Sequence, residues 1–399
     1  MMAGSLPTPS RSPIPAGFKT IATNANSTIN GTITNNDSTG GLVLGTSTRT
    51  LTVGLISGTG SRGVTFGSSA LTGTVTLTGS SNYTGDTRID SSTLGITGTG
   101  AIPAGGNLVF QGSGTATFDV NGTTQTVAGL NDSVLAGAIR STAANGKLIV
   151  GDSNDSTFRG VMSTANLALE KVGTGKLTLS GSNTYSGGTT VSAGSLLVNG
   201  SLTNSAVTVG SGGTLGGSGT LGALVAVQLG GVLSPGNSPG ILAAAELDLQ
   251  AGSTTLMQVI GSGSAAGTAG TDYDQVQITT ASSLTYGGEL VLSFINSPLF
   301  DNGTLFSLFQ FTGTARGGFT SVRTEGTGSY SGLTLQYNSN GNWYTNPNTA
   351  AGQYLVLSPA SGQLAIVPEP STWVMAAIGA GLVALKARRR KRADASLAA

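Results

Sequence analysis

The chain has 399 residues, of which 64 are glycine and only 9% are charged, and its formal net charge is +1. It contains no cysteine and no histidine, which excludes disulfides, thiolate nucleophiles, Cys/His zinc sites and any Ser-His or Cys-His catalytic pair. Hydrophobic residues still reach 38% with only 5% aromatics, so a core must be built from small aliphatic side chains. This composition predicts thin stacked β layers and no cofactor.

The basic charge is concentrated at the end of the chain. Residues 1–385 keep 12 of the 18 basic side chains and, because Asp394 lies in the tail, 16 of the 17 acidic ones, a balance of −4. An acidic body of this kind does not fit a nucleic-acid-binding groove. We therefore expect no nucleic-acid partner.

The first segment, residues 1–22, contains no apolar run and has prolines at positions 7, 9, 13 and 15. We interpret it as a disordered or incomplete N-terminus. Exported proteins begin with a secretory signal peptide. Either the true start lies upstream of Met1, or the chain is not exported; we favour the upstream start because the body and the tail described below both fit export.

Residues 73–96 align without a gap onto residues 175–198, which indicates an internal repeat. Nine pairs of aligned positions are identical, and in three further pairs both residues are apolar. The nine identical pairs are Gly73/Gly175, Thr76/Thr178, Leu77/Leu179, Gly79/Gly181, Ser80/Ser182, Tyr83/Tyr185, Gly85/Gly187, Thr87/Thr189 and Leu94/Leu196.

Within the second copy, residues 176–180 alternate with period two and are followed by a Gly-Ser-Asn turn signal. Similar strands of three to five residues recur along the chain. They are too short for a sandwich but suit the faces of a parallel β-helix that buries Leu and Val in layers. We predict a β-solenoid over residues 23–253, with Leu179 and Leu196 facing inward and Thr178 on the opposite face.

From about residue 254 the expected strands become longer and richer in Phe, for example residues 289–295 and 304–311. Just before them, residues 241–249 are Ala-rich and fit either a helix or a strand; we predict a strand. Because the last coil of a solenoid leaves an open sheet edge, we interpret residues 254–360 as a terminal β domain or cap.

The segment 148–240 resembles the autotransporter-associated β-strand repeat of bacterial surface proteins. The resemblance rests on residues 170–179 (EKVGTGKLTL), 183–190 (NTYSGGTT) and 233–240 (LSPGNSPG), and residues 118–130 resemble the linker between such repeats. It implies a right-handed parallel β-helix, and the family carries no general catalytic residues.

The last segment, residues 361–399, resembles the PEP-CTERM sorting tail that an exosortase recognises. The motif residues are Val367, Pro368, Glu369 and Pro370, and the apolar segment runs from Trp373 to Leu385. The basic stop consists of Lys386, Arg388, Arg389, Arg390, Lys391 and Arg392.

The two prolines favour an extended recognition segment. The thirteen apolar residues of the tail would span about 20 Å as a helix, against a hydrocarbon core of about 30 Å. We expect flanking residues and snorkelling by Lys386 to complete a single short transmembrane helix. The positive-inside rule then keeps the basic stop cytoplasmic and places everything before Pro368 outside the inner membrane. The resemblance implies transient anchoring there, followed by release to the cell surface or medium.

Two acidic pairs, Asp86/Asp90 and Asp152/Asp155, are candidates for polysaccharide cleavage, because a parallel β-helix can present carboxylates on one face. Asp and Asn are also common turn residues, and we favour that interpretation. The segment Asp272-Tyr273-Asp274 suggests a calcium site, but it lacks the pattern of a calcium loop. We favour a solvated turn there and expect no metal site.

Some aromatic residues are candidates for sugar contact. Tyr83 and Tyr185 occupy equivalent repeat positions, for which internal packing is the favoured interpretation. Trp343 and Tyr344, which lie among Asn and Gly, are the better exposed candidates.

These observations together predict a non-enzymatic exported surface or extracellular-matrix structural protein, sorted and processed by an exosortase, with exopolysaccharide as a candidate partner. An adhesin or glycan-binding protein is the first alternative. A polysaccharide-active β-helix enzyme is the second. The specific ligand and the oligomeric state stay open.

Overall fold

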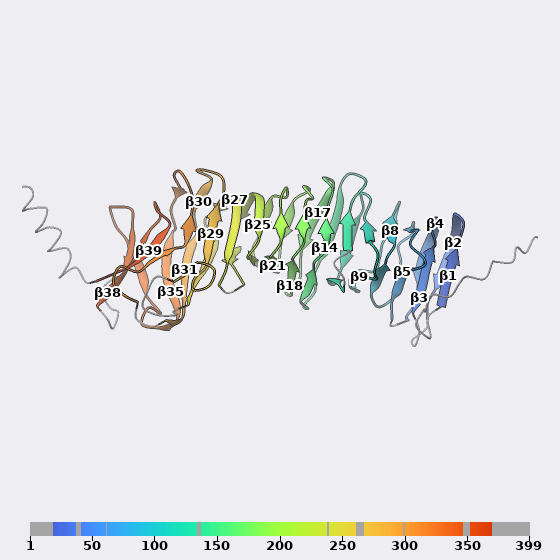
Figure 1. The fold of residues 1–399 in the computed structure, drawn as a ribbon, viewed down its shortest axis with the longest axis horizontal. Coiled ribbons are helices and arrows are strands. Elements are labelled where there is room, and N and C mark those ends of the chain that lie inside the picture. Colours follow the sequence, from blue (N-terminus) through green and yellow to red (C-terminus); the bar gives the residue numbers. More distant parts are fainter. Residues whose placement is uncertain are drawn as a thin grey trace, which may run out of the picture.

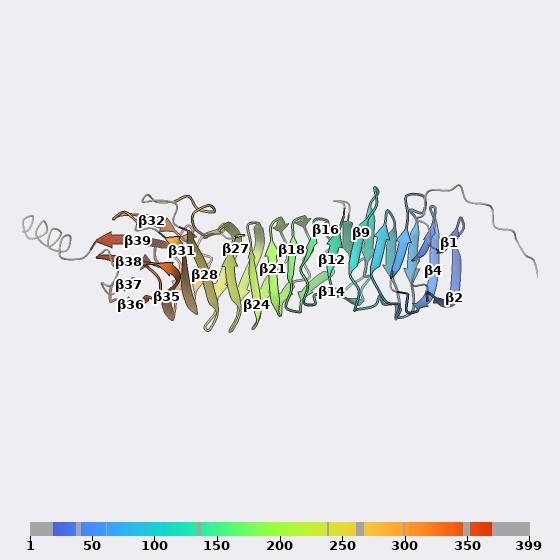
Figure 2. The same ribbon diagram turned by 90° about the horizontal axis from the view of Figure 1, so that it is seen from below.

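The computed structural model describes residues 19–368 except 37–40, 61, 134–136, 238, 261–266, 298–299 and 346–351. All regular elements in this part of the chain are β-strands. They wind into one elongated parallel β-solenoid whose coils follow one another in sequence order (Figures 1 and 2). The predicted all-β solenoid is therefore confirmed.

The N-terminal part of the solenoid has two parallel sheets. The first has the order β1 (Lys19–Thr23), β3 (Leu42–Thr46), β5 (Val64–Gly67), β7 (Thr87–Asp90), β9 (Leu108–Gln111) and β12 (Leu130–Asp132). The second has the order β16 (Val161–Met162), β13 (Gly137–Arg140), β10 (Ala116–Asp119), β8 (Thr93–Ile96), β6 (Thr74–Leu77), β4 (Thr50–Ser57) and β2 (Ser27–Thr34).

Two larger sheets continue the body. The main path of one is β11 (Thr124–Val127), β14 (Gly146–Val150), β17 (Leu167–Lys171), β20 (Thr189–Val191), β23 (Val207–Val209), β25 (Thr220–Val227), β27 (Ile241–Leu249), β29 (Gln275–Ile278) and β33 (Phe309–Gln310). Short strands beside it are β19 (Ser182–Asn183), β22 (Ser201–Leu202), β30 (Leu284–Tyr286) and β34 (Arg316–Gly317). Residues 241–249 are thus a strand, as predicted.

The other large sheet begins parallel and ends antiparallel. Its parallel strands are β15 (Ser156–Phe158), β18 (Lys176–Leu179), β21 (Gly194–Val198), β24 (Gly213–Gly217), β26 (Val232–Pro235), β28 (Thr254–Ile260), β31 (Glu289–Ser297) and β35 (Ser321–Gly328). Its antiparallel strands are β36 (Thr334–Tyr337), β37 (Trp343–Thr345), β38 (Gln353–Ser358), β39 (Gln363–Pro368) and β32 (Leu305–Ser307).

Parallel pairing therefore continues beyond residue 254, from β28 to β31 and β35, before the antiparallel strands close the C-terminal end (Figure 2). The expected domain boundaries after residues 22, 253 and 360 stay predictions. Within the described residues, no helix has the length and apolar character needed to cross a bilayer. The expected transmembrane helix, Trp373–Leu385, lies outside the described residues.

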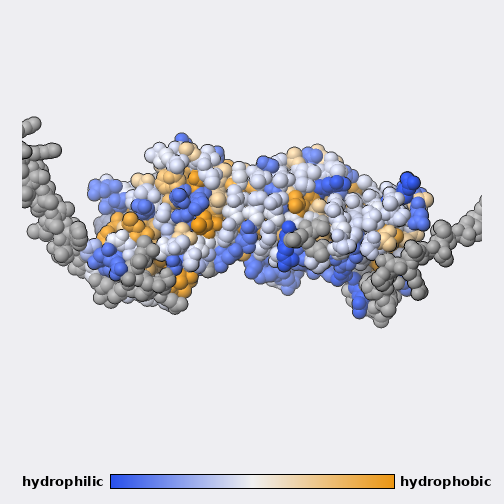
Figure 3. Space-filling view, in the orientation of Figure 1, coloured by the Kyte–Doolittle hydropathy of each residue, from blue (hydrophilic) through white to orange (hydrophobic). Residues whose placement is uncertain are grey.

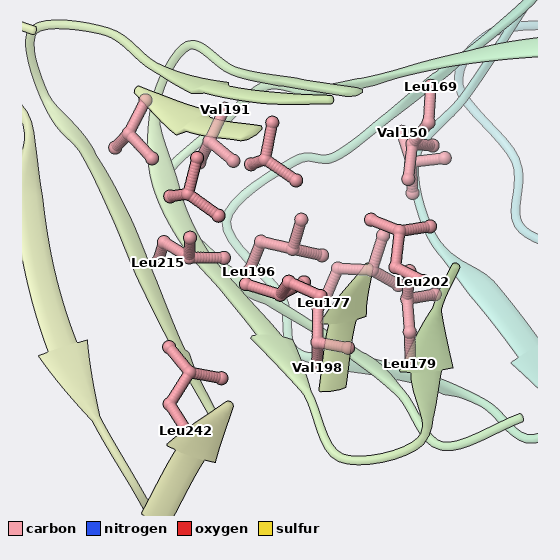
Figure 4. Close-up of a cluster of buried hydrophobic side chains, with 14 of the residues drawn as sticks. Val150, Leu169, Leu177, Leu179, Val191, Leu196, Val198, Leu202, Leu215 and Leu242 are labelled. Carbon is pink, nitrogen blue, oxygen red and sulfur yellow. The ribbon is translucent and has the colours of Figure 1, made fainter. Parts of the chain in front are cut away.

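The core consists of aliphatic side chains stacked in register from coil to coil. Leu177 pairs with Leu196, Leu196 with Leu215 and Leu215 with Leu233, and all four are buried. Figure 4 shows Leu177, Leu196 and Leu215 among the inward side chains of this cluster. Leu179 is also buried, whereas Thr178 is only partly buried, so the predicted inward and outward positions are confirmed.

Glycine allows successive coils to approach closely at the turns. Gly151 has a φ of 141°, and a Cβ built on it would lie 1.8 Å from the carbonyl oxygen of Val172 in the next coil. No L side chain fits that geometry without a shift of the backbone. The high glycine content thus serves the tight stacking on which the solenoid depends.

Candidate processing site

The last strand of the described chain, β39, includes Val367 and Pro368, the first two residues of the candidate sorting motif. In the antiparallel ladder between β38 and β39, Val367 pairs with Tyr354 and Pro368 pairs with Gln353. Val367 and Pro368 are partly exposed and extended, as expected for a segment next to proline. The remaining predicted tail residues lie outside the described residues: Glu369, Pro370, Trp373, Leu385, Lys386, Arg388, Arg389, Arg390, Lys391 and Arg392.

Gln353, the partner of Pro368, is fixed by a buried hydrogen-bond network. Its Nε2 donates to the carbonyl oxygen of Phe300 at 2.8 Å and to Oδ1 of Asn302 at 2.9 Å. Its Oε1 accepts a bond from the hydroxyl of Tyr330 at 2.5 Å. Because buried amide groups are costly to leave unpaired, this network holds the start of β38 in place.

Among the described residues, the pairing on the other edge of β39 extends as far as Ile366. The amide of Ile366 donates to the carbonyl oxygen of Thr304 at 2.9 Å, and the amide of Gly303 donates to the carbonyl oxygen of Ile366 at 2.7 Å. The strand pairing with β32 itself reaches Ala365. Val367 and Pro368 are therefore paired on the β38 side.

Three of the four candidate carboxylates, Asp86, Asp152 and Asp155, lie in the loops between strands, whereas Asp90 is the last residue of β7. The carboxylate of Asp86 pairs with Arg88 at 2.6 Å and accepts bonds from Asn107 in the next coil. The backbone amide of Asn154 donates to the carboxylate of Asp152, and the backbone amide of Lys176 donates to that of Asp155. These bonds hold the pKa of each carboxyl below its usual value. A general acid needs the opposite shift, so this geometry favours the turn interpretation.

Asp274 departs from the expected solvated turn. It is buried, and its two carboxylate oxygens accept backbone N–H bonds from Gly240 and Gln258, each at 2.8 Å. Burial raises its pKa to about 6. The sequence did not predict this burial, because the two amides belong to segments distant in the sequence that the fold brings next to Asp274. Among the described residues, no cluster of three or more His, Cys, Asp or Glu suits a metal ion.

The repeated tyrosines pack inside the coils. Tyr83 and Tyr185 are both buried, and their hydroxyls share hydrogen bonds with Thr87 at 2.6 Å and Thr189 at 2.7 Å. Their burial rules out stacking on a sugar at the surface. The identical contact in both copies explains why the Tyr and Thr recur at the same spacing.

Trp343 is also buried, contrary to the exposure expected from its Asn- and Gly-rich surroundings. Tyr337, opposite it in the antiparallel pair β36–β37, packs at 5.1 Å between ring centroids and is itself 61% exposed. Tyr344 is partly exposed. Sequence reasoning missed Tyr337 because its exposure depends on the register of these two strands.

Lys171 is the other residue that sequence reasoning missed. Although charged, it is buried, and its Nζ donates to the carbonyl oxygens of Val172, Gly173 and Ala193 at 2.6, 3.0 and 3.2 Å. Burial lowers its pKa. The contact to Ala193 joins two successive coils, which gives the lysine of the repeat motif a structural role.

Comparison with known families agrees with both resemblances. The family described as passenger-associated-transport-repeat matches residues 72–96 and 169–198, which contain the two aligned copies, 73–96 and 175–198. The PEP-CTERM protein-sorting motif matches residues 367–391. No curated protein matches the chain. The parallel β-solenoid thus carries passenger-associated-transport repeats, of the autotransporter type, and a PEP-CTERM sorting signal follows it. Together they indicate an exported protein of the cell envelope or surface that an exosortase processes.

Proposed function

We propose that this protein is a non-enzymatic structural component of the cell surface or extracellular matrix, released from the inner membrane by an exosortase. The observation that carries the proposal is the position of the sorting motif. It begins in the last strand of the body, so cleavage near it would release the solenoid as one unit. Exopolysaccharide is the partner we propose for the released body.

The chemistry of the body supports a structural role. The candidate catalytic carboxylates Asp152 and Asp155 have lowered pKa values and bind turn amides. Both oxygens of Asp274, whose pKa is raised, accept backbone N–H bonds. The bonds of Asp155 to Lys176 and of Asp274 to Gly240 join adjacent coils, whereas Asp152 is bonded within its own turn.

The test of release uses the full chain, expressed with a working signal peptide in a host that has the matching exosortase. The wild type should lose its tail and leave the membrane fraction. The variant Glu369→Ala/Pro370→Ala should remain membrane-bound at full length, as the wild type should in a host without exosortase. Changing Arg388, Arg389, Arg390 and Arg392 to Glu should let unprocessed chain slip outward, because basic residues oppose translocation.

A wild-type tail that stays attached in the competent host, while the body appears outside the cell, would contradict the processing account. The residues Trp373–Leu385 would then act as an anchor or an interfacial segment. Release of reducing ends or unsaturated sugars from a polysaccharide by the purified body would contradict the non-enzymatic role.

A second candidate function, glycan binding, is favoured by the exposed ring of Tyr337. Figure 3 shows apolar surface toward the C-terminal end of the body, and Tyr337 belongs to β36, which lies at that end in Figure 2. An exposed aromatic face can stack on a sugar ring. Retention of the full chain on a polysaccharide array should fall in Tyr337→Ala and persist in Leu229→Ala, which removes a still more exposed apolar side chain from the solenoid. Equal retention of both variants and the wild type would exclude Tyr337 as the contact.

A further inference from the structure

The sorting motif overlaps the last strand of the folded body, so part of the motif is already paired within the sheet. Val367 and Pro368 belong both to β39 and to the matched sorting motif. Proteases commonly bind an extended segment by adding it as a strand to their own backbone. A backbone edge already paired with β38 is not available for that purpose.

The membrane segment leaves little room to avoid the conflict. Only residues 369–372 separate Pro368 from Trp373. Four extended residues reach about 14 Å at most. While β39 stays fully paired, the closed end of the body would therefore sit against the bilayer surface, next to the site where a membrane protease must bind the motif.

We propose that the antiparallel strands β36 to β39 at the C-terminal end control processing, because the end of β39 must separate from β38 before an exosortase can bind Val367-Pro368-Glu369-Pro370. This inference rests on the proposed release by exosortase and adds a conformational step to it. Val367 and Pro368 cannot be paired with β38 and bound by an exosortase at the same time.

The contacts define which part opens. Ile366 is bonded on the β32 side through Thr304 and Gly303, and Gln353 is anchored by Phe300 and Tyr330. Beyond Ile366, the pairing found in the described part of the chain is with Tyr354 and Gln353. Opening is thus confined to the last two residues of β39, and the buried residues Leu364 and Ile366 stay packed.

An engineered disulfide tests this step, because the chain has no cysteine of its own. The variant Tyr354→Cys/Val367→Cys joins the pair that must open. The matched control Val356→Cys/Ala365→Cys joins the next pair inward on the same, partly exposed face. Directly opposed residues of antiparallel strands lie within the Cα distance that a disulfide accepts.

Each full-length variant would be produced in a host without exosortase, oxidised, and mixed with exosortase-containing membranes with or without reductant. Tail cleavage is followed by immunoblot, and the wild type with and without reductant controls for effects on the enzyme. We expect oxidised Tyr354→Cys/Val367→Cys to be cleaved at least about tenfold more slowly than its reduced form, because the competent open state is no longer populated. The oxidised inner control should be cleaved at the wild-type rate.

A Gly-Ser linker inserted between Ile366 and Val367 should have the opposite effect and accelerate cleavage, because it places the motif outside the ladder. Equal cleavage of oxidised and reduced Tyr354→Cys/Val367→Cys would overturn the gating inference and leave release by exosortase intact. Absence of cleavage in every sample, wild type included, would overturn both.

Discussion

Leu196 and Leu197 allow a direct test of the solenoid core, because the same side chain occupies both faces of β21. Leu196 is buried between Leu177 and Leu215 of the adjoining coils, whereas Leu197 is partly exposed beside Thr178 and Gly216. Truncating Leu196 to Ala removes three buried carbons, a transfer loss of about 2.5 kcal/mol. The neighbouring layers are fixed by parallel pairing, so incomplete collapse of the cavity should add about 1–2 kcal/mol.

We therefore expect Leu196→Ala to lower the free energy of unfolding by about 4 kcal/mol and Leu197→Ala by about 1 kcal/mol or less. Urea denaturation followed by circular dichroism measures the difference. Since each coil contacts only its neighbours, hydrogen exchange should show the loss of protection concentrated in β18, β21 and β24. Equal destabilisation by the two substitutions, or loss of protection spread evenly over the chain, would refute the layered register.

Three further predictions concern buried polar groups and metal. Tyr83→Phe should cost about 1–3 kcal/mol because it leaves a buried hydroxyl without its bond, and Tyr185→Phe about 1 kcal/mol, because Thr189 keeps a 2.9 Å bond to Ser205. Equal urea midpoints for the two variants would contradict this. Burial raises the pKa of Asp274 from 3.8 to about 6, so the native state binds more protons than the unfolded state between these values. Stability should rise as pH falls from 6 to 4, by up to about 3 kcal/mol. Denaturation of Asp274→Asn across the same range should lack this increment, and an unchanged pH dependence would exclude the assignment. Chelation by EDTA should leave the circular dichroism spectrum and melting profile unchanged, and a large loss of structure would reveal a structural metal.

The sequence alone determined the features that depend on local period. Alternation in residues 176–180 specifies which side chains face inward, because successive side chains of a strand point to opposite faces. The gapless alignment of the two copies indicates coils of the same construction, and the recurring Tyr and Thr mark one internal contact. The sorting tail could also be identified from the sequence, because its motif, apolar segment and basic stop are contiguous in the chain.

Tertiary structure decided the features that depend on which distant segments meet. Lys171 is buried because the carbonyl of Ala193, from the next coil, helps to bind its ammonium group. Asp274 is buried because Gly240 and Gln258 supply its hydrogen bonds. The pairing of Val367 with Tyr354 is likewise a matter of antiparallel register, which local pattern does not specify. Local alternation sets the face on which a side chain lies, but only the fold sets what it meets there.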